Sequence, residues 1–124
     1  MDVLELLLKA EIPNLPEKEV KIKRLSELCG ADVCFRLRAL PYNRAAEISK
    51  EQREDMNVHI LLVGVISPDL KSKELIAKYG AATPAEMVKK MLLPGEIEDI
   101  SRAVERLSGY RKETIEEVKE IKNA

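Results

Sequence analysis

The chain has 124 residues, of which 45% are hydrophobic and 35% charged, and its 21 Lys and Arg nearly balance its 22 Asp and Glu. This length suits one domain, spanning residues 1–124, with a core of its own. The even charge balance argues against a nucleic-acid partner. No run approaches the roughly 20 apolar residues that span a bilayer, so a membrane partner is not expected either.

The first predicted element is a short helix over residues 3–9, begun by a capping box between Asp2 and Glu5. Three of its leucines need apolar cover, namely Leu4, Leu7 and Leu8. We favour burial of these leucines on the protein's own core over burial on a partner. Pro13 and Pro16 then indicate an extended connector.

Two segments in which apolar and charged residues alternate, 19–25 and 33–38, predict an antiparallel β-hairpin within a portion that spans 17–40. Gly30 and Asp32 mark its loop. A two-stranded ribbon is marginal alone, so its apolar face should lie on a helix. Its outer face is basic, and we interpret it as a solvated face in preference to a site for an acidic partner. The basic residues are Lys21, Lys23, Arg36 and Arg38.

Few residues of this chain could carry chemistry. Cys29 and Cys34 flank the hairpin loop, and in a cytosolic chain two such thiols are more often reduced core residues than a bridge. His59 is the single histidine, and it does not complete a four-ligand metal site with them. We interpret it as a core-edge histidine in preference to a proton switch. No phosphate-binding loop, metalloprotease motif or nucleophile elbow is present, so no cofactor and no enzymatic activity are expected.

Residues 41–110 are predicted to form a helical core. A charged helix over 42–55 is followed by the most apolar run of the chain, 57–66, for which periodicity leaves helix and strand open. The neighbouring helices favour a helix there. Ser72 begins a further short helix, which Gly80 ends.

The clearest signals for the start and end of helices come next in the chain. Thr83 is a good N-cap, Pro84 suits the first helical position, and Glu86 completes a capping box. Pro94 ends this helix because it lacks an amide proton. The next helix begins at once and ends at Gly109, a residue suited to a left-handed C-terminal cap.

A terminal helix is predicted within residues 111–124, over 111–122. Its apolar stripe is thin and consists of Ile115, Val118 and Ile121. A terminal helix with so narrow a stripe is weakly anchored by its own domain, so it is a candidate for fraying or for binding a partner. The predicted fold class is therefore α+β and predominantly helical, with one N-terminal antiparallel β-hairpin packed on about five to six short helices.

The run from 68 to 110, PDLKSKELIAKYGAATPAEMVKKMLLPGEIEDISRAVERLSGY, resembles the C-terminal part of a phage tail assembly chaperone family. Members of this type are encoded by contractile-tailed phages and prophages of Gram-positive bacteria. The turn at residues 92–96 is the most specific part of the resemblance. Pro41 departs from the family pattern, since Ser or Thr is more usual there. The N-terminal half resembles the same family at residues 12–16, 19–26 and 38–42.

What the resemblance implies is a chaperone without catalysis that binds the tape measure protein, a long helical chain that fixes tail length. It would keep that protein soluble in the host cytoplasm and leave before the virion is mature. The major tail tube protein is a second candidate partner. The alternative is a structural tail or baseplate subunit that stays in the particle. A small DNA-binding regulator ranks low, because the helix at 84–92 offers only Lys89 and Lys90 to DNA.

Two groups of residues are candidates for partner binding. The first group contains two methionines, whose flexible thioethers adapt to many partner shapes, and the apolar turn that follows them. It consists of Met87, Met91, Leu92 and Leu93. For the two methionines a place in the core is the favoured alternative. The second group is the stripe of Ile115, Val118 and Ile121.

Overall fold

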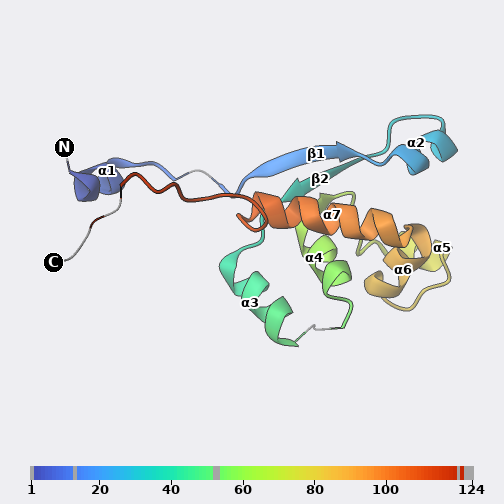
Figure 1. Ribbon diagram of the computed structural model, residues 1–124. Coiled ribbons are helices and arrows are strands. Elements are labelled where there is room, and N and C mark those ends of the chain that lie inside the picture. The colour runs from blue at the N-terminus through green and yellow to red at the C-terminus, as the bar shows by residue number, and fades with distance from the viewer. Residues whose placement is uncertain (1, 13, 52–53, 120, 122–124) are drawn as a thin grey trace.

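The computed structural model describes residues 2–12, 14–51, 54–119 and 121 (Figure 1). These residues form seven helices and a three-stranded antiparallel sheet, which confirms the predicted α+β, mostly helical class. In chain order the elements are α1 (Val3–Lys9), β1 (Glu17–Lys21), α2 (Lys23–Cys29), β2 (Cys34–Arg38), α3 (Tyr42–Glu51), α4 (Met56–Gly64), β3 (Val65–Ser67), α5 (Lys73–Lys78), α6 (Pro84–Met91) and α7 (Pro94–Leu107).

Strands β1 and β2 pair antiparallel as predicted, with Glu17 opposite Arg38 and Lys21 opposite Cys34. The prediction that the first strand continues to residue 25 is wrong, because helix α2 begins at Lys23. The alternation of apolar and charged residues that suggested a longer strand covers too few residues to distinguish a strand from the start of a helix. Helix α2 fits between the strands because Gly30 ends it in the left-handed conformation, at φ 67°.

The third strand was not predicted. β3 follows α4 directly and pairs antiparallel with β2, so that β2 is the central strand of the order β1-β2-β3. The apolar run at 57–66 is therefore helical as far as Gly64, as favoured, and extended beyond it. Val65 and Ile66 are β-branched residues, which pack well on a pleated sheet. Ile60 and Val63 of α4 are β-branched too, so it is the pairing of β3 with β2 that makes this end of the run extended.

Helices α4 and α7 pack against each other at the centre of the body, and one face of the sheet covers them (Figure 1). Phe35 and Leu37 point from β2 into this core, and Leu61 of α4 and Val104 of α7 are fully enclosed. The buried polar group Ser101 is satisfied, because its hydroxyl donates to Asn57 Oδ1 at 3.0 Å. The predicted packing of the β-ribbon on helices is thus confirmed.

The start of α6 follows its sequence closely. Thr83 is the N-cap and its Oγ1 accepts from the amide of Glu86 at 3.1 Å, with Pro84 at the first helical position. The Glu86 carboxylate accepts from the amide of Ala82 at 3.1 Å, one residue earlier than the capping box predicted. The backbone N–H of Ala82 and a nearby lysine both lower the pKa of Glu86, against the effect of burial. The left-handed conformation of Gly109, at φ 92°, also agrees with the prediction.

Two terminal arms leave the same end of the body (Figure 1). The N-terminal arm is residues 2–12 and 14–16, including α1, and the C-terminal arm is residues 111–119 and 121. The prediction that Leu4, Leu7 and Leu8 lie on the protein's own core is wrong, since all three are exposed and α1 buries no residue.

The predicted terminal helix is also absent, because none of residues 113–119 or 121 is helical. Helices shorter than about 12–15 residues are marginal in water without packing partners, which explains the difference. Cys29 and Cys34 are unbridged, and both are exposed, so the prediction of core positions for these thiols is wrong.

Candidate partner-binding surface

The first predicted contact group is mostly interior. Met87 is fully buried, and Met91 and Leu92 are also part of the core. This confirms the alternative interpretation of the two methionines and leaves no thioether of this group on the surface. Leu93, in contrast, is 52% exposed at the turn between α6 and α7. Of the four residues, only Leu93 is placed where a partner could reach it without opening the body.

The second predicted group lies entirely on the surface. Ile115, Val118 and Ile121 of the C-terminal arm are 90%, 91% and 75% exposed. Their availability to a partner agrees with the sequence interpretation, although the helix that was expected to carry them has not formed.

Prediction from sequence missed a third apolar surface, on the N-terminal arm. Between residues 3 and 12 its large apolar side chains are more than half exposed, namely Val3, Leu4, Leu6, Leu7, Leu8 and Ile12. At about 100° per residue, the apolar residues of α1 cover about 200° of the helix circumference, and Glu5 and Lys9 occupy the rest. A helix with so wide an apolar face is normally buried on several sides. The signal was present in the sequence, but it was assigned to the protein's own core.

The turn at residues 92–96 is held by an ion pair that no local pattern reveals. Arg24 of α2 donates from Nε to Glu96 Oε2 at 3.1 Å and from Nη2 to Glu96 Oε1 at 2.8 Å. Arg24 Nη2 also donates to the Met91 carbonyl oxygen at 2.9 Å, where α6 ends. Glu96 Oε1 in turn accepts from the amide of Leu93 at 2.7 Å. This turn is therefore a braced corner between α6 and α7.

The charge on Glu96 is set by these contacts. Its hydrogen bonds from Arg24 lower the pKa of the Glu96 carboxyl below the usual range, and the Leu93 amide lowers it further. Partial burial opposes both effects. The same pairing raises the pKa of the Arg24 guanidinium. Both groups are consequently charged at neutral pH.

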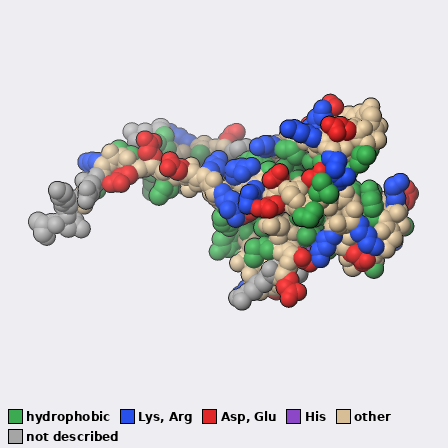
Figure 2. All heavy atoms as spheres, turned by 45° about the vertical axis from the view of Figure 1, so that its right-hand side comes forward, with side chains coloured by type: hydrophobic (Ala, Val, Ile, Leu, Met, Phe, Trp, Pro, Cys, Tyr) green, Lys and Arg blue, Asp and Glu red, His purple; other side chains and the backbone are tan. Residues whose placement is uncertain are grey.

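A cleft of about 470 Å³ lies between β1 and α7, and we call it the β1–α7 groove. Its apolar lining consists of Val20, Ile22, Ile100 and Ala103. Its rim is mostly basic, with Lys18, Lys21, Lys23, Arg24 and Arg106 against Glu96 and Asp99. Figure 2 shows Lys and Arg side chains gathered among hydrophobic patches on the body beside the terminal arms.

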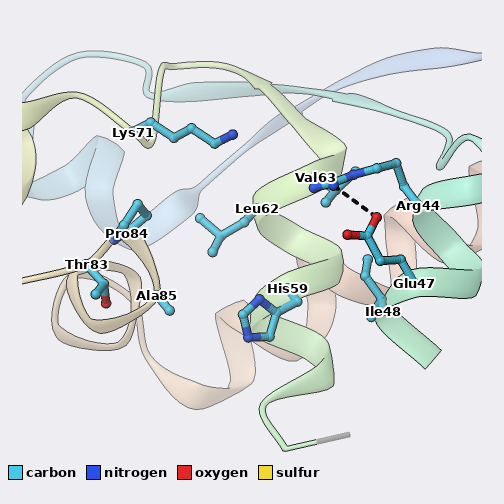
Figure 3. Close-up of a pocket in the computed structure, with 10 residues that line it drawn as sticks. All are labelled: Arg44, Glu47, Ile48, His59, Leu62, Val63, Lys71, Thr83, Pro84 and Ala85. Carbon is cyan, nitrogen blue, oxygen red and sulfur yellow. Dashed lines mark hydrogen bonds and ion pairs between the residues drawn. The ribbon is translucent and has the colours of Figure 1, made fainter. Parts of the chain in front are cut away.

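A second cleft, of about 380 Å³, lies between α3, α4 and the start of α6 (Figure 3). His59 and Leu62 line it from α4, Pro84 lines it from α6, and an ion pair between Arg44 and Glu47 borders it on α3. Among the residues that the structure describes, no three His, Cys, Asp or Glu side chains are grouped as metal ligands would be. His59 is half-buried at the core edge, as the sequence interpretation favoured.

None of the helices in the described part of the chain is long and apolar enough to cross a bilayer. Most of the exposed large apolar side chains in the described residues lie on the two arms.

Comparisons with known proteins agree with the resemblance seen in the sequence. Among curated proteins, none has a significantly similar sequence. The crystal structure of YqbN from Bacillus superposes with a TM-score of 0.60, covering 82% of this chain and 99% of YqbN. At 22% sequence identity this likeness shows the fold alone. Residues 51–122, more than half of the chain, match the family model described as phage XkdN-like tail assembly chaperone protein. The chain therefore belongs to the phage XkdN-like tail assembly chaperone family.

Proposed function

We propose that this protein binds the tape measure protein in the host cytoplasm and keeps it soluble during tail morphogenesis. Binding is non-catalytic, and the protein leaves as tail-tube subunits assemble, so it is absent from the finished particle. The major tail tube protein is a secondary partner, because it takes over the same apolar stretches as it polymerises. Membership of a tail assembly chaperone family supports a partner among tail proteins.

The observation that carries this proposal is the exposure of apolar residues on both arms while the body is closed. The exposed large apolar side chains of the arms reach 87% exposure at Ile12 and 91% at Val118, whereas the core residues Leu37 and Val104 are fully buried. A chain with a complete core of its own has no internal use for these side chains. Large exposed apolar surfaces on soluble proteins commonly mark interaction sites.

The chemistry of the arms suits a long helical partner. An apolar helix face is recognised when it lies in a groove between apolar elements, which requires no nucleotide. α1 offers an apolar face on most of its circumference, and Ile115 with Val118 offers a second apolar edge. Fully burying one leucine or isoleucine contributes about 1.5–3 kcal/mol, so a few such contacts per copy give reversible binding.

Co-expression tests this proposal directly. The soluble fraction of a tape measure protein should rise several-fold when this chain is made with it. The double variants Leu4→Asp with Leu7→Asp, and Ile115→Asp with Val118→Asp, should each reduce the gain because a charge on the arm must be desolvated on binding. Leu28→Asp is the matched control, since Leu28 is 71% exposed on α2, at the other end of the body.

An equal soluble fraction with and without the chain contradicts chaperone activity. Mass spectrometry of purified particles addresses the alternative of a structural subunit. A chaperone is missing from finished particles, whereas a tail or baseplate subunit is present at a fixed stoichiometry.

A further inference from the structure

The free edge of strand β1 borders the β1–α7 groove. Among the described residues β1 pairs with β2 alone, so its other edge carries no strand. The amide of Ile22 donates to the Val33 carbonyl oxygen at 2.9 Å. Because the hydrogen-bonding direction alternates along an antiparallel strand, the even-numbered residues of this segment face β2 and the odd-numbered ones face away from it. The backbone N–H and C=O groups of Glu17, Glu19 and Lys21 therefore point outward, where a further strand can pair with them.

The apolar floor of the groove continues along this edge. Lys18 and Val20 lie on one face of β1, and both line the groove. Ile100 and Ala103 line it from α7. A strand added beside β1 places every second side chain over the same floor. Apolar side chains at those positions fit the floor, so an extended segment suits this groove better than a helix.

The rim of the groove has basic residues at both of its ends. Lys18 near the start of β1 and Arg106 near the end of α7 lie towards the arms, and Lys23 lies at the other end, where α2 begins (Figure 1). These three residues form no ion pair within the part of the chain that the structure describes. Asp99 is the rim's single acidic residue outside an ion pair, since Glu96 is paired with Arg24. The rim is therefore complementary to acidic residues at the two ends of an occupant.

We propose that the β1–α7 groove binds an extended, acidic segment of another protein, which pairs antiparallel with the free edge of β1. Apolar side chains at every second position cover the floor, and acidic side chains at its ends meet the basic ends of the rim. β1 has five residues, about 17 Å of strand, so a segment of about seven residues spans the groove. The antiparallel direction continues the sheet as it stands, in which both pairings are antiparallel.

Lys18 makes this edge selective. A charged side chain that faces inward at a sheet edge disfavours indiscriminate pairing, because a neutral strand leaves that charge without a partner. An acidic residue opposite Lys18 removes this penalty. The inference goes beyond the proposed function, since it requires neither of the arms and no tape measure protein.

A short synthetic peptide tests the groove with the full chain. The probe is the fluorescent, end-capped sequence Glu-Thr-Val-Thr-Val-Thr-Glu, whose glutamates and valines share one face in a strand. It should bind in fluorescence anisotropy. The same peptide with both glutamates replaced by lysine should bind about tenfold more weakly, because each favourable contact with the rim becomes repulsive.

Methylation of single backbone nitrogens in the peptide tests the pairing itself. With a glutamate opposite Lys18 and a valine opposite Val20, the central threonine lies opposite Lys21 and donates its N–H to β1. Its N-methylation should weaken binding about tenfold or more, since it removes that hydrogen bond and places a methyl group against the edge. N-methylation of the first valine, whose N–H points away from β1, is the matched control. Binding should also protect the amides of Glu19 and Lys21 from hydrogen exchange.

Charge reversal on the protein identifies the groove as the site. Lys18→Glu with Lys23→Glu should weaken binding of the glutamate peptide about tenfold and strengthen binding of the lysine peptide. Lys50→Glu with Lys78→Glu changes exposed lysines on α3 and α5 and is the matched control, which should bind the glutamate peptide as the parent does. Thermal unfolding checks that each variant retains the folded body.

Three results overturn the proposal. The first is no binding of the glutamate peptide at low salt, where surface ion pairs are strongest. The second is a methylated threonine that is tolerated as well as the methylated valine, because the peptide then does not pair with β1 as proposed. The third is a dimer of the protein alone in which the amides of Glu19 and Lys21 are already protected, because a second copy then covers the edge. The co-expression gain depends on the arms, so its failure and the failure of peptide binding are separate outcomes.

Discussion

Gly64 of α4 lies directly against Val104 of α7, so closely that a Cβ on Gly64 would be 3.0 Å from Val104 Cβ and closer still to both methyl groups. This contact sits where α4 gives way to β3, and Val104 is fully buried. A side chain at position 64 would separate the two central helices of the body. The glycine therefore sets how closely they pack.

The variant Gly64→Ala should lower the free energy of unfolding by about 1–3 kcal/mol, because overpacking a closed core costs that much and outweighs the better helix propensity of alanine. Urea denaturation followed by circular dichroism measures the change. Gly95→Ala is the matched control, since a Cβ there meets nothing within 4 Å. It should leave stability unchanged or raise it by up to about 1 kcal/mol. Equal effects of the two substitutions would show that packing against Val104 is not the cause.

The ion pair between Arg24 and Glu96 predicts a specific dependence of stability on pH. The pKa of Glu96 is lower in the folded protein than its ordinary value of 4.5, chiefly because Arg24 donates hydrogen bonds to it. Ionised Glu96 therefore stabilises the fold above that value, and this stabilisation is lost as pH falls through the lower, folded pKa. Glu96→Gln should cost on the order of 1 kcal/mol at pH 7. The difference from the parent protein should narrow below about pH 4.5.

Urea denaturation of both proteins between pH 3 and pH 7 measures this difference. Glu11→Gln changes an exposed glutamate outside any helix or strand and should leave the unfolding free energy at pH 7 unaffected. A difference between parent and Glu96→Gln that stays constant over the whole pH range would exclude the ion pair as its source.

Removal of residues 1–12 should not change the stability of the body. α1 buries no residue, and the first backbone hydrogen bond from this end to the sheet is the one that the Ala39 amide donates to the Pro16 carbonyl oxygen at 2.9 Å. The truncated protein should unfold within about 0.5 kcal/mol of the full chain, the range expected for changes away from the core. Its gain in the co-expression assay should fall sharply. A marked loss of stability would instead place the leucines of α1 on the body in solution.

Much of the helical body could be predicted from local patterns, because the residues that cap its helices lie next to those helices in the sequence. Thr83 and Pro84 start α6, and Gly109 follows the end of α7, as expected. The Arg24–Glu96 brace could not be predicted, since its partners are 72 residues apart and nothing in either local sequence specifies the other. Strand β3 was missed for a related reason: Val65 and Ile66 continue an apolar run, and only their pairing with β2 makes them extended.

The arms show a different limit. The apolar residues of α1 and of the C-terminal arm showed that these segments need a binding surface. They did not show whether that surface is on the same chain. Leu4 was assigned to the core and Ile115 to a helix because residues of this kind are usually found there. Both assignments fail, because the core of the body is complete without these side chains.

The two free thiols, Cys29 and Cys34, lie on α2 and at the start of β2, at the end of the molecule away from both arms (Figure 1). A biosensor surface coupled through either thiol would therefore hold the protein with both arms directed into solution. A purification handle fused to the amino or carboxyl terminus would instead crowd the arms and could hide a real interaction in a pull-down.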